Sequence, residues 1–485
     1  MKEIKGIKHI RESFKTRQVK YGGYAVLITL GVIVGLILIN LLVGQFAPQI
    51  DMTQNKLFSL SDETLKVLDQ VKTPVKFYGL WKPGEESQDV LPVINLYLAK
   101  NKNITLDVID PDKNPGFVAK YDKDKKGISR GSLVVEGDKG FRVIAPYDMY
   151  DFTQNQQGGQ NITGVSVERR ITSALLFAGT GTTPVLYELT GHNEAALSSL
   201  GMVDTVEREN YTVKSLNLIV DSMPADASAI IMNGPKKDLT PDEANKLLDY
   251  LGNGGRLMVL ADYNAGELTN LNTVFASYGI KFDYGVAVET DNNYMINIPF
   301  SEIPDMADHD ITKPLADKHS TPVVLLQAMS LSQLDTVRRT IEIKPLMTSS
   351  ARSFLRTDLN ETSPNKVASD ISGPLTLGMA VADPGTGWID PNKPQPQARI
   401  VVIGCGSLLP IAAQGIDGNR DFFMNSLSWV QNRPETISVR SKSLFMLPLR
   451  LNLIQLIIFA GVFILIIPVA FFVTGFVTWL KRRHL

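Results

Sequence analysis

The chain has 485 residues, too many for one ordinary hydrophobic core, so its length predicts two or three domains. Basic and acidic residues nearly balance, at 49 Lys and Arg against 50 Asp and Glu. This balance excludes the strongly positive surface that is typical of nucleic-acid-binding proteins. Cys405 is the only cysteine, so no internal disulfide can form and stability must come from the burial of apolar side chains.

An uncharged apolar segment lies near each end of the chain, at residues 24–46 and 451–480. Both segments are longer than the about 20 apolar residues that a helix needs to cross a bilayer. We therefore predict one transmembrane helix at each end. The first apolar run is longer than the hydrophobic region of a signal peptide, and no small-residue cleavage site follows it. Both features favour a retained anchor over a cleaved leader.

Basic residues flank both predicted helices on the side of the chain ends. The tail 1–23 carries seven Lys or Arg and two Glu, and the tail 481–485 is also basic. Because basic flanks remain in the cytoplasm, we predict a two-pass cell-membrane protein with cytoplasmic termini and a large extracytoplasmic domain. Arg440, Lys442 and Arg450 favour the opposite orientation, but they are fewer.

Residues 51–154 predict a first domain with a thioredoxin-like fold. Ser61 precedes two acidic residues and an apolar repeat, which is typical of a helix N-cap. The expected elements then follow the order β-α-β-α-β-β, at residues 75–80, 90–99, 104–109, 117–121, 132–136 and 141–145. No C-x-x-C motif is present for thiol chemistry. The stretch 155–164, rich in Gln, Asn and Gly, is predicted to be a loop between domains.

Residues 165–435 predict a second, α/β domain. From residue 185 the pattern alternates strands and helices, which is typical of a parallel sheet. In the best local signal, Thr240 caps a helix, Pro241 takes its first position, and Glu243 can bond back to the cap. Residues 292–397 are richer in Pro and Ser and are predicted to form an irregular insertion that carries a few strands, such as 322–326 and 375–381. A buried strand at 399–403 then resumes the sheet.

Polar residues follow several predicted strands of this sheet. Asp262 comes directly after the strand 256–260, at the carboxyl edge where open α/β sheets usually bind ligands. His192 and Glu194 follow another strand and could form a metal or acid-base site. The alternative is a turn whose polar groups cap the backbone, and we favour it because no second His cluster lies nearby. His192, Glu194 and Asp262 are thus a candidate ligand-binding or vestigial site, with no catalytic residue assigned.

Cys405 follows the strand 399–403, in the position that a nucleophile occupies in α/β hydrolases. Its flanking residues, Gly404, Gly406 and Ser407, do not match the G-x-[SC]-x-G spacing. A small buried side chain is therefore the favoured interpretation. Neither a phosphate-binding G-x-x-x-x-G-K-[ST] loop nor a G-x-G-x-x-G turn occurs. We expect no ATP hydrolysis by this chain, and we predict no cofactor and no metal.

Small and polar residues interrupt both predicted membrane helices. Gly31 and Gly35 form a G-x-x-x-G face, Asn40 lies one or two turns further on, and Gln455 lies in the second helix. Small residues let helices approach closely, and polar groups in hydrocarbon need partners. We expect these residues to pack against a partner, although chance small residues in a membrane helix are the alternative.

Several blocks in a fixed order resemble the GldG-like family of auxiliary components of ABC-type transport systems, first associated with gliding motility. The blocks that carry the resemblance are Asp51-Met52-Thr53 with Lys56 to Ser61, the turn Gly191-His192-Asn193-Glu194, residues 234–262, and Gly418 to Asn425 followed by Arg433-Pro434. No single block is diagnostic, but their order and the helix-domain-helix plan make the match specific.

This resemblance implies a non-catalytic subunit beside a separate ABC ATPase subunit and a separate multi-span ABC permease subunit, with two copies per complex as one expected arrangement. It also implies an α/β domain similar to glutamine-amidotransferase-like folds without their working triad. Many family members carry Gly-Asp-Ser where this chain has Gly404 to Ser407.

Two other functions stay open at this point. One is an extracellular hydrolase or amidotransferase-like enzyme built on His192, Glu194 and Cys405, which must then lie within hydrogen-bond reach of one another. The other is a structural anchor for surface or motility machinery.

Overall fold

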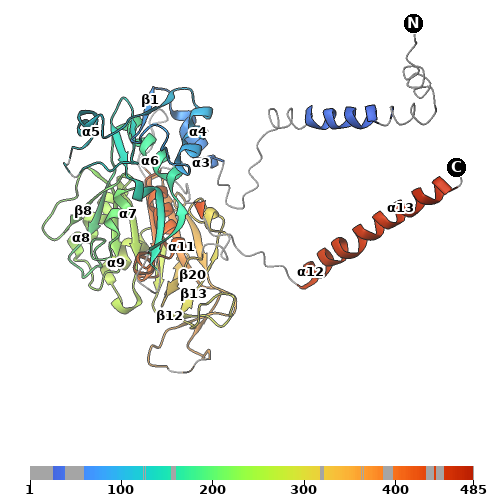
Figure 1. Cartoon of the computed structure of the whole chain (residues 1–485). Helices are drawn as coiled ribbons and strands as arrows, with labels where there is room; N and C mark the ends of the chain where they lie inside the picture. Colours follow the sequence, from blue (N-terminus) through green and yellow to red (C-terminus); the bar gives the residue numbers. More distant parts are fainter. Residues whose placement is uncertain are drawn as a thin grey trace, which may run out of the picture. The chain divides into compact units, whose positions relative to one another are not determined.

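The computed structural model describes residues 24, 26–38, 59–123, 125, 127–154, 160–316, 322–361, 363, 365–385, 397–432, 442–443 and 453–483 (Figure 1). The chain divides into two units, Met1–Leu57 and Phe58–Leu485. In the first unit, the described residues form the apolar helix Val26–Leu38.

A four-stranded sheet with the order β2-β1-β3-β4 forms the first domain of the second unit. β1 is parallel to β2, and β3 is antiparallel to both β1 and β4. The strands and helices occur in the order that the sequence predicts. The elements of this domain are α3 (Asp62–Gln70), β1 (Val75–Gly79), α4 (Val90–Lys100), β2 (Ile104–Val108), α5 (Pro115–Tyr121), β3 (Leu133–Glu136), β4 (Phe141–Ile144), η1 (Pro146–Met149), β5 (Tyr150–Gln154), β6 (Gln160–Val165) and α6 (Val167–Thr180).

Helix α6 covers one face of this sheet and completes its core. Ile171 and Leu175 of α6 pack in one buried cluster with Phe77 of β1 and Tyr97 of α4. The Tyr97 hydroxyl is buried and donates a hydrogen bond to the carbonyl of Glu168, at 2.9 Å. Because a buried hydroxyl is costly without a partner, this bond fixes α4 against α6.

The sequence predicted a loop over the whole stretch 155–164, but part of this stretch is a strand. Its last residues belong to β6, which pairs with β5 in an antiparallel hairpin. The two-residue strand β22 (Lys442–Ser443) then pairs with the other side of β6, so that Lys442 lies opposite Val165. The chain between α11 and the C-terminal helix is therefore hydrogen-bonded to the first domain.

One largely buried ion pair and one partly exposed ion pair connect the two domains of the second unit. The Arg170 side chain of α6 is 8% exposed, and its Nη1 lies 2.7 Å from Oε1 of Glu209 in the second domain. Arg208, next to Glu209, pairs in turn with Asp148 of the first domain, at 3.0 Å. Removing one partner of a buried pair is strongly destabilising, so the Arg170–Glu209 pair helps to hold the domains together.

An eight-stranded sheet with the order β14-β17-β20-β21-β10-β9-β7-β8 forms the second domain. The five strands from β21 to β8 are parallel, and β20, β17 and β14 are antiparallel to their neighbours. The elements are β7 (Val185–Leu189), α7 (Val203–Glu207), β8 (Thr212–Leu216), β9 (Ala227–Asn233), α8 (Pro241–Gly252), β10 (Arg256–Leu260), η2 (Tyr263–Ala265), α9 (Thr269–Ala276), β11 (Ile280–Asp283), β12 (Val286–Val288), β13 (Ser301–Glu302), β14 (Asp305–Met306), η3 (Lys313–Leu315), β15 (Leu325–Leu326), β16 (Ser330–Gln333), β17 (Glu342–Thr348), β18 (Phe354–Arg356), β19 (Ile371–Ser372), β20 (Thr376–Asp383), β21 (Ala398–Ile403), α10 (Leu408–Ala413) and α11 (Asp417–Val430).

The segment 292–397 is not simply an irregular insertion into a parallel sheet. The strand predicted at 375–381 is β20, and the segment also supplies β14 and β17, so the sheet is mixed. Two register shifts interrupt the pairing of β17 with β20, around Pro345 and Met347. A register shift moves side chains to the other face of a sheet, and this obscures the alternation by which a strand is found in a sequence.

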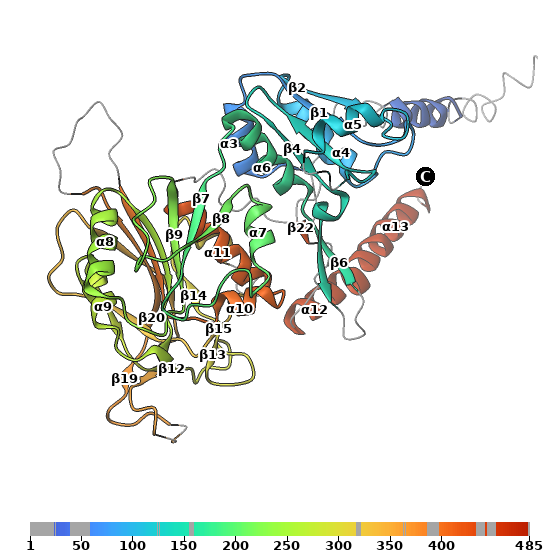
Figure 2. The ribbon, with the colours of Figure 1, turned by 90° about the vertical axis from the view of Figure 1, so that its left-hand side faces the viewer.

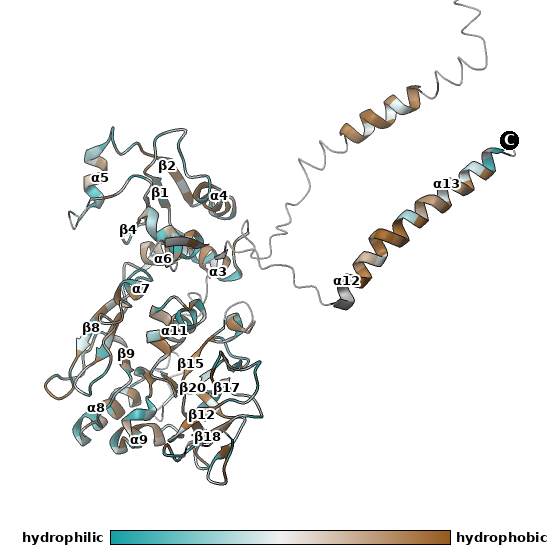
Figure 3. Ribbon diagram, turned by 60° about the horizontal axis from the view of Figure 1, so that its bottom comes forward, coloured by the Kyte–Doolittle hydropathy of each residue, from teal (hydrophilic) through white to brown (hydrophobic). Residues whose placement is uncertain are grey.

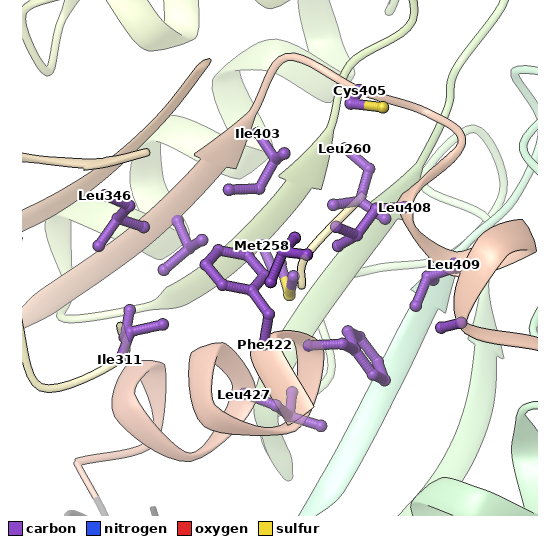
Figure 4. Close-up of a cluster of buried hydrophobic side chains, with 14 of the residues drawn as sticks. Met258, Leu260, Ile311, Leu346, Ile403, Cys405, Leu408, Leu409, Phe422 and Leu427 are labelled. Carbon is purple, nitrogen blue, oxygen red and sulfur yellow. The ribbon is translucent and has the colours of Figure 1, made fainter. Parts of the chain in front are cut away.

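Each face of the large sheet carries its own core. Successive residues of a strand point to opposite faces. In β10, Met258 and Leu260 therefore pack with Phe422 of α11 (Figure 4), while Leu257 and Val259 pack with α8 and α9. Figure 2 shows α8 and α9 on one side of the sheet and α10 and α11 on the other.

The C-terminal helix comprises α12 (Leu453–Ala460), a π-helical segment (Gly461–Ile466) and α13 (Ile467–Arg483). Its residues Ile457–Lys481 are long and apolar enough to cross a membrane (Figure 3). These 25 residues span about 37 Å at ~1.5 Å per residue, against a hydrocarbon core of about 30 Å. Val26–Leu38 is too short for that test. The rest of the expected first span lies outside the described residues, so that span stays a prediction.

Candidate functional site

The parallel strands bring four loops together at their carboxyl edge. The loop after β7 contacts the loop after β9, because the amides of Lys236 and Lys237 donate to the carbonyl of His192, at 2.8 and 3.2 Å. The loop after β10 joins the end of β21 through the amide of Ala261, which donates to the Ile403 carbonyl at 2.8 Å. His192, Glu194 and Asp262 thus all lie at this edge.

His192 lies between two carboxylates and is almost inaccessible to solvent. Its Nδ1 is 3.1 Å from Oε1 of Glu194, and its Nε2 is 3.2 Å from Oε2 of Glu243. The hydrogen bond to Glu194 and the charge of Glu243 raise the pKa of His192. Both ring nitrogens face acceptors, so a doubly protonated imidazolium satisfies this geometry. Neither nitrogen is free to bind a metal or to take up a proton.

Glu243 also caps helix α8, as the sequence predicts. The Thr240 hydroxyl accepts a hydrogen bond from the Glu243 amide, and the Glu243 carboxylate accepts one from the Thr240 amide, at 2.8 Å. Burial alone raises the pKa of Glu243, but the bonds from Thr240 and the charge of His192 outweigh it and lower that pKa. One carboxylate therefore serves both the helix cap and the histidine.

Asp262 is the more accessible of the predicted residues. Its Oδ1 accepts from the Asn264 amide at 2.9 Å, and its Oδ2 pairs with Lys236 Nζ. The backbone of Gly406 lies close by, because a Cβ at that position would be 2.9 Å from Oδ2. The side chains of Asp262 and Lys236 are 17% and 38% exposed, so this part of the edge is open but its charges are paired.

Cys405 is buried beside the same edge (Figure 4). Its Sγ lies 3.4 Å from the Leu326 carbonyl oxygen and 3.0 Å from Ser407 Oγ. Burial raises the pKa of the thiol, which keeps it in the unreactive protonated form. Among the described residues, neither His192 nor Glu194 is a hydrogen-bond partner of Cys405. The three residues of the enzyme hypothesis are therefore not one constellation.

Two further buried carboxyl groups lie in the same domain, and no sequence signal marked them. Glu289 accepts hydrogen bonds from the Ser350 hydroxyl and amide, at 2.7 and 3.1 Å. Glu302 is 1% exposed, and neither of its carboxyl oxygens has a partner among the described residues. Burial and the charge of Glu289 raise the pKa of Glu302 to about 8, so it is protonated at neutral pH.

The described part of the chain contains no group of three or more His, Cys, Asp or Glu that could hold a metal ion. The residues expected to pack membrane helices are only partly described. A Cβ added at Gly31 or Gly35 would meet no atom within 4 Å. Asn40 and the side chain of Gln455 lie outside the described residues.

Two family models match the chain. One is described as an ABC-type uncharacterized transport system and matches residues 183–426, half of the 485 residues. The other is a domain of unknown function (DUF7088) and matches residues 54–150. No curated protein matches. A solved structure, the mmIFT52 N-terminal domain, is 14% identical and covers 51% of this chain and 96% of its own, with a TM-score of 0.37. A likeness at that TM-score carries no argument.

The matched region contains the whole carboxyl edge, from β7 to the loop after β21. Together with the apolar C-terminal helix, the match indicates association with a membrane. The chain belongs to the family of auxiliary components of ABC-type transport systems.

Proposed function

We propose that the protein is a non-catalytic, two-pass auxiliary subunit of an ABC transporter. Its large extracytoplasmic domain binds, guides or senses the substrate beside a separate ATPase and permease. The observation that supports the non-catalytic role is that the candidate catalytic side chains at the carboxyl edge are hydrogen-bonded to other groups or buried. His192 is held between Glu194 and Glu243, and Cys405 is a buried thiol, so the groups that an enzyme needs are already engaged.

The first domain is proposed to be a thioredoxin-like scaffold without redox function. Its sheet order, its single antiparallel central strand β3 and the covering helix α6 support that fold. The sequence has one cysteine, in the other domain. Dithiol chemistry needs two, so this domain contributes a surface to the complex and no reaction.

Copurification tests the auxiliary role directly. Tagged full-length protein is extracted in mild detergent, and the recovered partners are identified by mass spectrometry. Recovery of an ABC ATPase and a multi-span permease is expected. If neither is recovered with an intact, folded chain, the protein is an independent enzyme or a structural anchor.

A conservative double variant separates the auxiliary role from the enzyme. Glu194→Gln with Cys405→Ala removes the carboxylate and the thiol of the enzyme hypothesis and keeps side-chain size nearly unchanged. Transport and partner recovery should match those of the control Lys366→Gln, an exposed change elsewhere. Loss of transport with normal recovery of partners would support the enzyme.

The membrane helices are proposed to dock against the permease through small residues. Gly31 and Gly35 lie four residues apart and therefore on one face of the helix, and residues without a side chain allow close approach by another helix. Changing both to Leu should reduce permease recovery while the large domain still folds. The matched control is Ile33→Phe with Ile37→Phe, which adds bulk about 200° round the helix. Equal recovery from both variants would mean that the glycine face does not hold the complex.

A further inference from the structure

A pocket of about 440 Å³ lies at the opposite end of β21 from the Cys405 loop. Arg399 at the start of β21, Trp429 near the end of α11 and His309 in the loop after β14 contribute to its lining. This volume lies within the range of small-molecule sites. None of the residues considered for the carboxyl edge belongs to it.

The floor of the pocket holds a cation, Arg399, that forms no ion pair with a described residue. The Arg399 guanidinium lies over the Trp429 ring, 4.8 Å from its centroid. Nη1 donates to the Trp429 carbonyl at 2.8 Å, and Nε and Nη2 both donate to Gln397 Oε1 at 3.1 Å. Guanidinium has about five N–H donors, so two remain. No described carboxylate lies within ion-pair distance of Arg399.

His309 adds a neutral donor to the same floor. The Ile311 amide donates to His309 Nδ1 at 3.2 Å, which requires an unprotonated Nδ1 and therefore a proton on Nε2. Burial lowers the pKa of His309, in agreement with a neutral ring. Its edge contacts Trp429, with ring centroids 5.1 Å apart. Trp429 thus fixes both the histidine and the arginine.

The mouth of the pocket carries negative charge. Asp308 and Asp310 are exposed on the rim, and neither forms an ion pair with a described residue. Glu342 and Lys344 neutralise each other at 2.7 Å, and Lys313 adds one exposed positive charge. A simple anion would pass two carboxylates to reach the floor, and a simple cation would meet Arg399 there.

We propose that this pocket binds a small zwitterion, with its carboxylate or phosphate on Arg399 and His309 and its ammonium group at Asp308 and Asp310. Charge-assisted hydrogen bonds of this kind are the strong ones. A free amino acid or short peptide and the ethanolamine phosphate headgroup of a lipid share this chemistry. The assignment goes beyond the proposed transport role and does not depend on it.

Calorimetric titration of the full-length protein in detergent tests this site. The zwitterions glycylglycine and phosphoethanolamine are compared with acetylglycine, which keeps only the anion, and glycinamide, which keeps only the cation. At least one zwitterion should bind about tenfold or more tightly than either singly charged probe, since each missing charge removes a charge-assisted bond. If the source is a lipid headgroup, mixed micelles of the detergent with phosphatidylethanolamine compete, and mixed micelles with phosphatidylglycerol do not. If neither lipid competes, the ligand is a free amino acid or short peptide.

Variants locate the binding in this pocket. Arg399→Gln, and separately Asp308→Asn with Asp310→Asn, should each weaken zwitterion binding about tenfold. The control Arg352→Gln removes an arginine that is 75% exposed and lies outside the pocket. No binding of either zwitterion to folded protein, equal binding of acetylglycine, or unchanged affinity in the rim variant would overturn the proposal. The rim residues are exposed, so that variant decides the question even where Arg399→Gln fails to fold.

Discussion

Glu302→Gln is expected to remove a pH dependence of stability around strands β13 and β15. In the wild type, Glu302 is buried without a hydrogen-bond partner among the described residues, and its pKa is raised from 4.5 to about 8. The folded state therefore keeps a proton that the unfolded state releases between these two values. Stability must fall as the pH rises from the lower to the upper value, and then level off.

The size of this effect follows from the shift. One pKa unit corresponds to about 1.4 kcal/mol, so the shift of Glu302 costs about 3 kcal/mol of unfolding free energy at neutral pH and about 5 kcal/mol above pH ~8. Gln cannot ionise, and any constant cost of its buried amide leaves the slope unchanged. The slope of stability against pH is therefore the informative quantity.

Amide hydrogen exchange of the full-length protein measures that slope locally. Opening free energies of peptides covering Ser301–Glu302 and Leu325–Leu326, corrected for intrinsic exchange, are compared from pH about 5 to about 8.5. The wild type and the exposed control Glu267→Gln should lose stability over this range, and Glu302→Gln should not. Parallel slopes in wild type and Glu302→Gln would refute the assignment of a buried protonated carboxyl group.

Three further predictions concern the histidine, the domain junction and the topology. His192→Asn should destabilise the second domain at pH about 6. This destabilisation should disappear as the pH rises through the raised pKa of His192, because the wild-type imidazolium then releases its proton. Thermal melts at several pH values measure this, and a loss of stability that does not depend on pH contradicts it. Arg170→Met should cost about 3 kcal/mol, because it removes the shorter of the two ion pairs of Glu209 and leaves only Arg169, at 3.3 Å. Adding Glu209→Gln should restore part of this loss in urea denaturation; additive losses would exclude the coupling. In intact cells a membrane-impermeant amine label should reach Lys236 but not Lys8, and labelling of Lys8 would reverse the orientation.

Local signals predicted the parts of the fold that depend on neighbouring residues. The Thr240 to Glu243 cap is confirmed because both of its hydrogen bonds join residues three positions apart. The strand before Asp262 was clear because β10 is buried on both faces and is therefore continuously apolar. That several loops meet at the carboxyl edge could also be predicted, because parallel strands all end at the same edge of the sheet.

Contacts between distant residues could not be predicted in this way. Glu243 was expected only as a cap, because nothing near it in sequence indicates His192, which lies 51 positions away. The antiparallel strand β17 was missed where a bulge breaks the alternation. The Arg399 pocket takes its lining from segments between residues 308 and 429, so it exists only once the sheet and α11 have packed.

The pairing of β22 with β6 determines which part of the protein is pulled first when the C-terminal helix moves. Lys442 and Ser443 are bonded to the first domain before the chain reaches the C-terminal helix at Leu453. A displacement of that helix therefore pulls on the β5–β6 hairpin before it pulls on α11. Two residue pairs join β22 to β6 within the described part of the chain, and hydrogen bonds are individually weak, about 1 kcal/mol net each. Small displacements of the C-terminal helix should therefore be transmitted to the first domain, and large displacements should break the β22–β6 hydrogen bonds.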